Sequence, residues 1–124
     1  MGWFLWPYRA IATLVAGLSY LQSILAGQFL SGTYSSLLGH QNNAAIIDML
    51  LILGIAVALP IPLWGRRAWW PVVFAAGLLG MTTVQNQLGF ARILTVHIPL
   101  GVAIVMAATG VAIWAWRASP KADG

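Results

Sequence analysis

Long apolar stretches separated by short polar links dominate the chain. Four stretches, at about residues 8–31, 37–63, 70–88 and 93–116, approach the ~20 residues that a helix needs to cross the hydrocarbon core of a bilayer. Because an open strand would leave backbone groups unpaired in lipid, we expect all four to be helices. Short links make successive helices antiparallel neighbours. The pattern therefore predicts an all-α membrane protein, an up-down-up-down four-helix transmembrane bundle that forms a single domain over residues 1–124.

Composition agrees with the bilayer as the solvent of this chain. Of 124 residues, 60% are hydrophobic and 6% are charged, against about 25% charged in soluble domains. The absence of cysteine excludes disulfides, zinc–thiolate sites, iron–sulfur clusters and c-type haem attachment. The net charge of +4 does not indicate a nucleic-acid partner, because the basic residues are few and lie at segment ends, as in membrane proteins.

The basic residues predict the orientation in the membrane. All except Arg92 fall at the two termini and in the middle link, and such residues favour the cytoplasmic side. We therefore expect a multi-pass protein of the bacterial cytoplasmic membrane with both termini and the middle link cytoplasmic. The tryptophans map to the same edge, as an interfacial aromatic belt. The basic residues on that side are Arg9, Arg66, Arg67, Arg117 and Lys121, and the tryptophans are Trp3, Trp6, Trp64, Trp69, Trp70, Trp114 and Trp116.

Two stretches of the chain share one plan. Leu21 to His40 and Val84 to Gly101 each run through a glutamine, a glycine near a segment end, a short link and a histidine that opens the next segment. The only two histidines of the chain occupy matching points of this plan. The similarity predicts two hairpin repeats, with the first and second helices echoed by the third and fourth.

Polar side chains inside a bilayer usually face a bundle interior or a site, and most of them collect in the outer half of this chain. The second helix starts either near Ser35 or Ser36, which places His40 within it at about the depth of His97, or at Asn42, which leaves His40 in the link. In the first case the two imidazoles can face each other across the core, as in bis-histidine ligation of haem. The alternative is that each histidine is a hydrogen-bonding residue between helices.

Several other residues fit a haem site. Gly101 lies one turn from His97 and leaves room for a porphyrin. Gln22, Gln85 and Gln87 are candidates for holding the imidazole N–H groups or the haem propionates. Arg92, at the outer edge, is a candidate propionate partner. For the glutamines, interhelical hydrogen bonding is the competing interpretation.

Asp48 is the only acid within the expected membrane segments. A buried carboxylate is neutral or paired, and we expect His97 or Gln22 as its partner. Its role is then to orient a histidine or to carry a proton, and the alternative is a protonated acid with one hydrogen bond. A transport or proton path through Asp48 is less favoured, because the aliphatic inner half offers no polar route.

Gly39-His40 and the stretch from Gln85 to His97 resemble one four-helix half of the haem A synthase family. That resemblance implies b-type haem held by His40 and His97 at the outer ends of the second and fourth helices. The catalytic half of that family has Glu and Arg where this chain has Leu37 and Gln41, so haem holding is carried over and oxidation of a haem methyl group is not. The chain is also similar to small uncharacterised four-pass bacterial membrane proteins.

Two functions follow as hypotheses. The first is a haem b-binding bundle for electron transfer or haem handling, whose partners are a membrane redox complex or further copies of the chain. The second is a cofactor-free structural accessory subunit of a larger membrane complex. The sequence has no hydrolase triad or phosphate loop, and we expect no independent catalytic activity.

Overall fold

The computed structural model describes residues 5–65 and 68–118 and is 89% helix. Within these ranges no strand occurs. The four predicted helical segments are confirmed, with ends that shift by a few residues. The second segment divides at Leu59 into a long and a short helix. The helices are α1 (Leu5–Leu30), α2 (Ser36–Ala58), α3 (Pro60–Gly65), α4 (Trp70–Phe90) and α5 (Leu94–Arg117).

Three helical stretches are long and apolar enough to cross a membrane: Leu5–Leu30, Ser36–Trp64 and Leu94–Arg117. The prediction of helices long and apolar enough to span a membrane is confirmed for these three. At 21 residues α4 is also long, but it falls short in apolar character. The reason lies in its C-terminal part, where two threonines are followed by the sequence Gln85-Asn86-Gln87.

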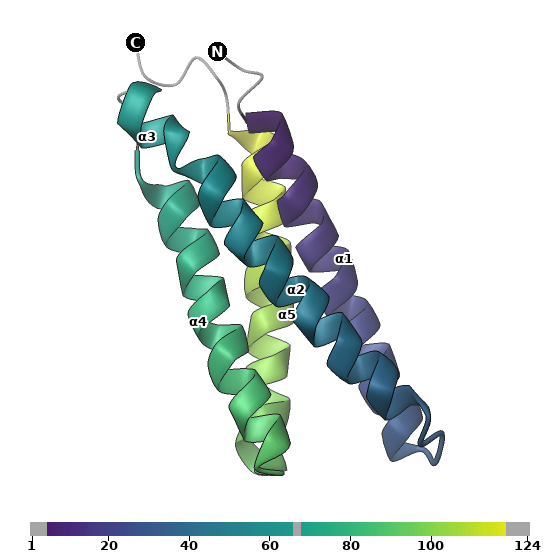
Figure 1. The fold of residues 1–124 in the computed structure, drawn as a ribbon. Helices are drawn as coiled ribbons and strands as arrows, with labels where there is room; N and C mark the ends of the chain where they lie inside the picture. The colour runs from purple at the N-terminus through teal and green to yellow at the C-terminus, as the bar shows by residue number, and fades with distance from the viewer. Residues whose placement is uncertain (1–4, 66–67, 119–124) are drawn as a thin grey trace.

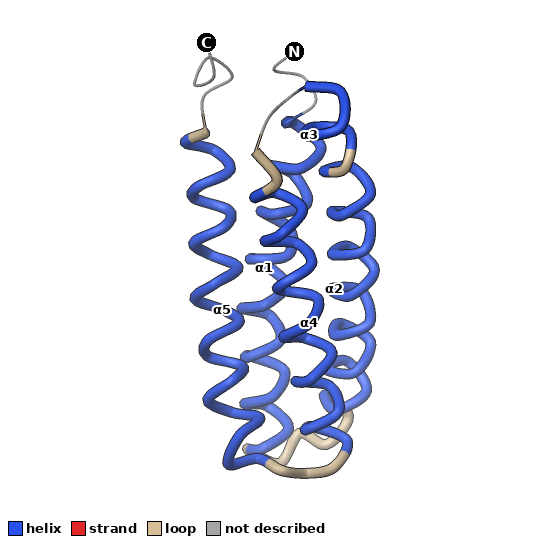
Figure 2. The backbone as a smooth tube through the Cα atoms, turned by 90° about the vertical axis from the view of Figure 1, so that its left-hand side faces the viewer, coloured by secondary structure: helices blue, strands red, loops and turns tan. Residues whose placement is uncertain are grey.

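The four long helices lie side by side along their length (Figures 1 and 2). Helix α1 packs against α2 and α5, and α4 packs against the same two helices. Consequently α2 and α5 face each other diagonally across the bundle. Links 31–35 and 91–93 lie at one end, and α3 lies at the other end, where the described parts of the chain begin and end (Figure 1).

The core lies toward the α3 end and consists largely of small side chains. Alanines there allow helices to approach closely, which is how helices in membranes gain packing energy. Toward the other end the α1–α2 pair diverges from the α4–α5 pair (Figure 1). The buried cluster comprises Tyr8, Ile11, Ala12, Val15, Ala16, Ile47, Leu51, Ala58, Ala75, Leu78, Ala108, Ala112 and Ala115.

Arg9 joins the beginning of α1 to the end of α5. Its Nε donates to the Ala115 carbonyl at 2.9 Å and its Nη2 to the Ala118 carbonyl at 2.8 Å. Its guanidinium carbon lies 5.7 Å from the Trp6 ring centroid and 5.5 Å from that of Trp116, which is cation–π range. Charged and aromatic groups thus gather at the α3 end. Outside the described residues lie Trp3, Arg66, Arg67 and Lys121.

Both links at the opposite end use a left-handed residue to end a helix. Gly32 has φ 104° and Arg92 has φ 58°. In each case the next residue donates back into the helix, with Thr33 N to Gln28 O and Ile93 N to Leu88 O, both at 2.9 Å. This is the glycine-favouring helix end, and a left-handed arginine adds strain of about 1 kcal/mol.

Candidate functional site

His40 and His97 come together between diagonal helices. Because α2 begins at Ser36, His40 lies within the second turn of the helix and not in the link. His97 lies in the first turn of α5. The centroids of the two imidazole rings are 6.3 Å apart and the rings are inclined at 66°. The sequence therefore identified two residues that the fold brings into one place.

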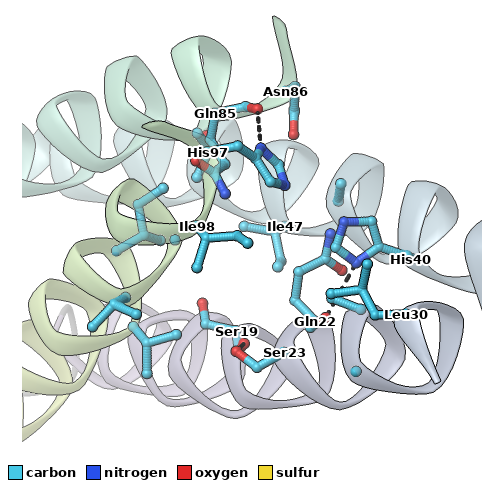
Figure 3. A pocket seen from close by; sticks show the side chains of 18 residues that line it. Ser19, Gln22, Ser23, Leu30, His40, Ile47, Gln85, Asn86, His97 and Ile98 are labelled. Atoms are coloured by element: carbon cyan, nitrogen blue, oxygen red, sulfur yellow. Dashed lines mark hydrogen bonds between the residues drawn. The ribbon is translucent and has the colours of Figure 1, made fainter. Parts of the chain in front are cut away.

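Each imidazole is held by the main chain of the preceding helix. Nδ1 of His40 lies 3.1 Å from the Gln22 carbonyl oxygen, and Nδ1 of His97 lies 2.9 Å from that of Gln85. A carbonyl only accepts, so Nδ1 carries a proton in both rings, and in the neutral imidazole the lone pair then lies on Nε2. Figure 3 shows the two rings directed at each other, with the second nitrogen of each in the space between them.

The two glutamines were expected to hold the imidazoles through their side chains, and it is their main-chain carbonyls that do so. The side chain of Gln22 instead accepts a hydrogen bond from Asn43 Nδ2 at 2.8 Å. Asn43, which is buried, also donates to the Leu18 carbonyl at 2.9 Å. In the second hairpin Gln85 Oε1 is buried without a hydrogen-bond partner. Asn43 was not predicted as a site residue, although a polar residue three positions after His40 was a usable signal.

Two glycines of the second hairpin are in close contact with the site. A Cβ at Gly89 would lie 2.9 Å from His97 Cε1, and a Cβ at Gly101 would lie 2.9 Å from Gln85 Nε2. The space predicted beside Gly101 for a porphyrin is thus occupied by the Gln85 amide. Gly89 was missed, and its position one turn after Gln85 is the signal that marks it.

Asp48 does not bond to either of the partners expected for it. Its Oδ1 accepts from Thr82 Oγ1 at 2.6 Å, and its Oδ2 accepts from Asn86 Nδ2 at 2.8 Å. Both partners belong to α4, which packs directly against α2. The expectation of His97 or Gln22 was wrong because the carboxylate of Asp48 is turned toward α4, whereas those two residues lie on α5 and α1.

Two cavities adjoin the histidines. The smaller, about 320 Å³, is also lined by Gln85 and Gly101 (Figure 3). The larger, about 640 Å³, is also lined by Asp48 and Arg92. Both include His40 and His97 in their walls, so together they form one hollow region around the two rings. Its size is typical of small-molecule and cofactor sites.

The predicted supporting residues are distributed unevenly around this region. Gln22 lines both cavities, whereas Gln85 and Gly101 line only the smaller one. Arg92 lies at the outer end of the larger cavity, in link 91–93. Gln87 is exposed on α4 and lines neither cavity, so the fold does not bring it to the histidines.

The donor atoms do not form a site for a bare metal ion. Within residues 5–65 and 68–118, no three His, Asp or Glu side chains are grouped to hold one, and structural or catalytic zinc sites need at least three protein ligands. A pair of imidazoles suits a metal that brings its other ligands with it, as iron does in haem.

Comparisons with known proteins found no relative of this chain. No family model, no curated protein and no solved structure matches it. The resemblance to the haem A synthase family therefore stays a prediction from the residues around His40 and His97.

Proposed function

We propose that this protein is a membrane-embedded haem protein in which His40 and His97 bind one b-type haem from opposite sides. The observation that carries the proposal is the matched presentation of two imidazoles. In each, the main chain holds Nδ1, which fixes the tautomer that ligates a metal through Nε2. Both hydrogen bonds are drawn as dashed lines in Figure 3.

The separation of the rings supports a shared metal. Metal–imidazole bonds are about 2 Å long, and a ring nitrogen lies about 1 Å from the imidazole centroid, given ring bonds of about 1.3 Å. Two imidazoles on opposite sides of one metal therefore have centroids about 6 Å apart, and the observed value is 6.3 Å. The hollow region that both rings line supplies space for the macrocycle.

Charge in the larger cavity favours one orientation of the haem. Arg92 lies at the outer end of this cavity, in link 91–93. Asp48 lies in the middle of α2, farther from the links than Arg92. Haem carries its two propionates on one edge, so Arg92 attracts that edge and Asp48 repels it. The strained left-handed conformation of Arg92 fits a requirement for a cation at a position where glycine is the easier residue.

We propose further that all four long helices cross the membrane in up-down-up-down order as two hairpin repeats. Both termini are then cytoplasmic in a bacterial cytoplasmic membrane, in agreement with Arg9 and the tryptophans at one end. Each hairpin contributes one histidine and the carbonyl that holds it. The haem lies in the outer half of the bundle. The protein serves a membrane redox complex there, by one-electron transfer or by haem handling.

The experiment is a haem titration of purified protein from haem-depleted cells. We expect a saturable Soret band at one haem per chain. The variant His40→Leu/His97→Leu should lose it, whereas Gln87→Ala, an exposed α4 residue outside both cavities, should keep it. A wild-type protein that binds no haem would reject the proposal and favour the cofactor-free accessory subunit.

A further inference from the structure

Asp48 is the one acidic residue within the described part of the chain, and it faces the larger cavity together with both histidines. Thr82 Oγ1 donates to Asp48 Oδ1 at 2.6 Å, and Asn86 Nδ2 donates to Oδ2 at 2.8 Å. Thr82 Oγ1 also lies 3.1 Å from the Leu79 carbonyl, a longer contact. Two donors directed at its two oxygens favour the ionised carboxylate.

The other groups around this cavity do not neutralise that charge. Helix α1 contributes Gln22, α4 contributes Asn86, and α5 contributes His97. The cation among the residues that line the cavity is Arg92, which lies in link 91–93, whereas Asp48 lies in the middle of α2. His40 and Asp48 are separated by eight residues of α2, or roughly 12 Å along the axis at about 1.5 Å per residue.

We infer that Asp48 is a fixed negative charge that balances the oxidised haem centre and thereby lowers its reduction potential. This inference rests on the proposed haem site. The core of ferric bis-imidazole haem has one net positive charge and that of ferrous haem has none, so a nearby carboxylate stabilises the ferric state selectively. At roughly 10 Å between the Asp48 carboxylate and the haem iron, and with an effective dielectric constant of about 20, the interaction energy still exceeds thermal energy.

The inference is tested by measuring the reduction potential of haem-loaded Asp48→Asn. The substitution keeps the shape of the side chain and removes the charge, so the ferric-to-ferrous affinity ratio should fall about tenfold. For a one-electron couple this equals a rise of about 59 mV. Thr83→Val is the matched control, because it removes a threonine hydroxyl on the same helix that bonds to the Leu79 carbonyl and not to Asp48. It should shift the potential by much less.

Each outcome decides the matter. A low-spin Asp48→Asn protein with an unchanged potential overturns the inference and leaves the haem proposal intact. An equal shift in Thr83→Val assigns the effect to a general disturbance of α4 and overturns it too. A wild-type protein without haem removes both proposals.

A second pair of variants covers the case in which Asp48→Asn fails to bind ferric haem. Asp48→Glu and Asp48→Gln have the same size and differ by one charge. We expect Asp48→Gln to bind ferrous haem under anaerobic conditions and to bind ferric haem at least tenfold more weakly than Asp48→Glu does. If Asp48→Gln binds neither form, or binds both as Asp48→Glu does, the role of the charge is refuted.

Discussion

The bare Cα of Gly89 lets the His97 ring lie directly against α4. A methyl group at this position would come within 2.9 Å of His97 Cε1, closer than side chains tolerate in a packed interior. The Gln85 carbonyl, one helical turn earlier on α4, holds Nδ1 of the same ring. Gly89 and this carbonyl together determine where Nε2 of His97 points.

We therefore expect Gly89→Ala to weaken haem binding by about tenfold or more, corresponding to ~1.4 kcal/mol. The added methyl group moves the imidazole of His97, so that Nε2 no longer points at the iron. Gly80→Ala is the matched control on the same helix, since a Cβ there meets nothing within 4 Å. It should leave the affinity unchanged. Haem titration of the two variants measures the difference, and equal affinities would show that Gly89 does not position His97.

The Gln22–Asn43 contact gives the first hairpin a polar support that the second hairpin lacks. Asn43 Nδ2 links two groups of α1 to α2, while the Gln85 amide lies over Gly101 with its oxygen unpaired. Each histidine therefore bonds to the main-chain carbonyl of a glutamine, but the two have different surroundings. On the proposed haem, this asymmetry would make the two sides inequivalent.

At the scale of elements, α4 is the helix whose place in the membrane most needs explanation. Its composition is too polar to mark it as a membrane span. The polar side chains nevertheless point largely inward, since Thr82, Gln85 and Asn86 line the smaller cavity. The Thr83 hydroxyl donates a hydrogen bond to the Leu79 carbonyl of the same helix at 2.7 Å. Polar groups that face the bundle interior are compatible with a spanning helix.

Cysteine labelling tests whether α4 crosses the membrane. The chain has no cysteine, so Ala68→Cys and Ala91→Cys each introduce a single thiol at exposed positions that flank α4. In intact cells we expect a membrane-impermeant maleimide to label Ala91→Cys and not Ala68→Cys. Thr33→Cys, in link 31–35, serves as the positive control. Labelling of both α4 sites from the same side would refute the proposed topology.

The helices were predictable from the sequence because apolar length and short links leave few alternatives in a bilayer. The position of His40 within α2 was one of two alternatives, since neither start had a decisive cap. Ser35, the residue that caps α2, makes no side-chain hydrogen bond to the helix. The partners of Asp48 and the fit of Gly89 could not be predicted, because they depend on how the helices are rotated against one another.

At the scale of the whole molecule, the bundle brings residues from opposite ends of the chain into one site. The packing order places α2 diagonally opposite α5, and His40 and His97 meet between these two helices. The alanine-rich half holds the helices together, and the other half is hollow. This division separates the packed core from the hollow region along the bundle axis.

The central claim is that His40 and His97 reach the same iron. Its most direct test is the spin and coordination state of haem in the single variants His40→Ala and His97→Ala, measured by absorption and electron paramagnetic resonance. We predict six-coordinate low-spin haem in the wild type and five-coordinate high-spin haem in each variant, with the low-spin state restored by added imidazole. A low-spin spectrum that persists in either variant without imidazole would contradict the claim.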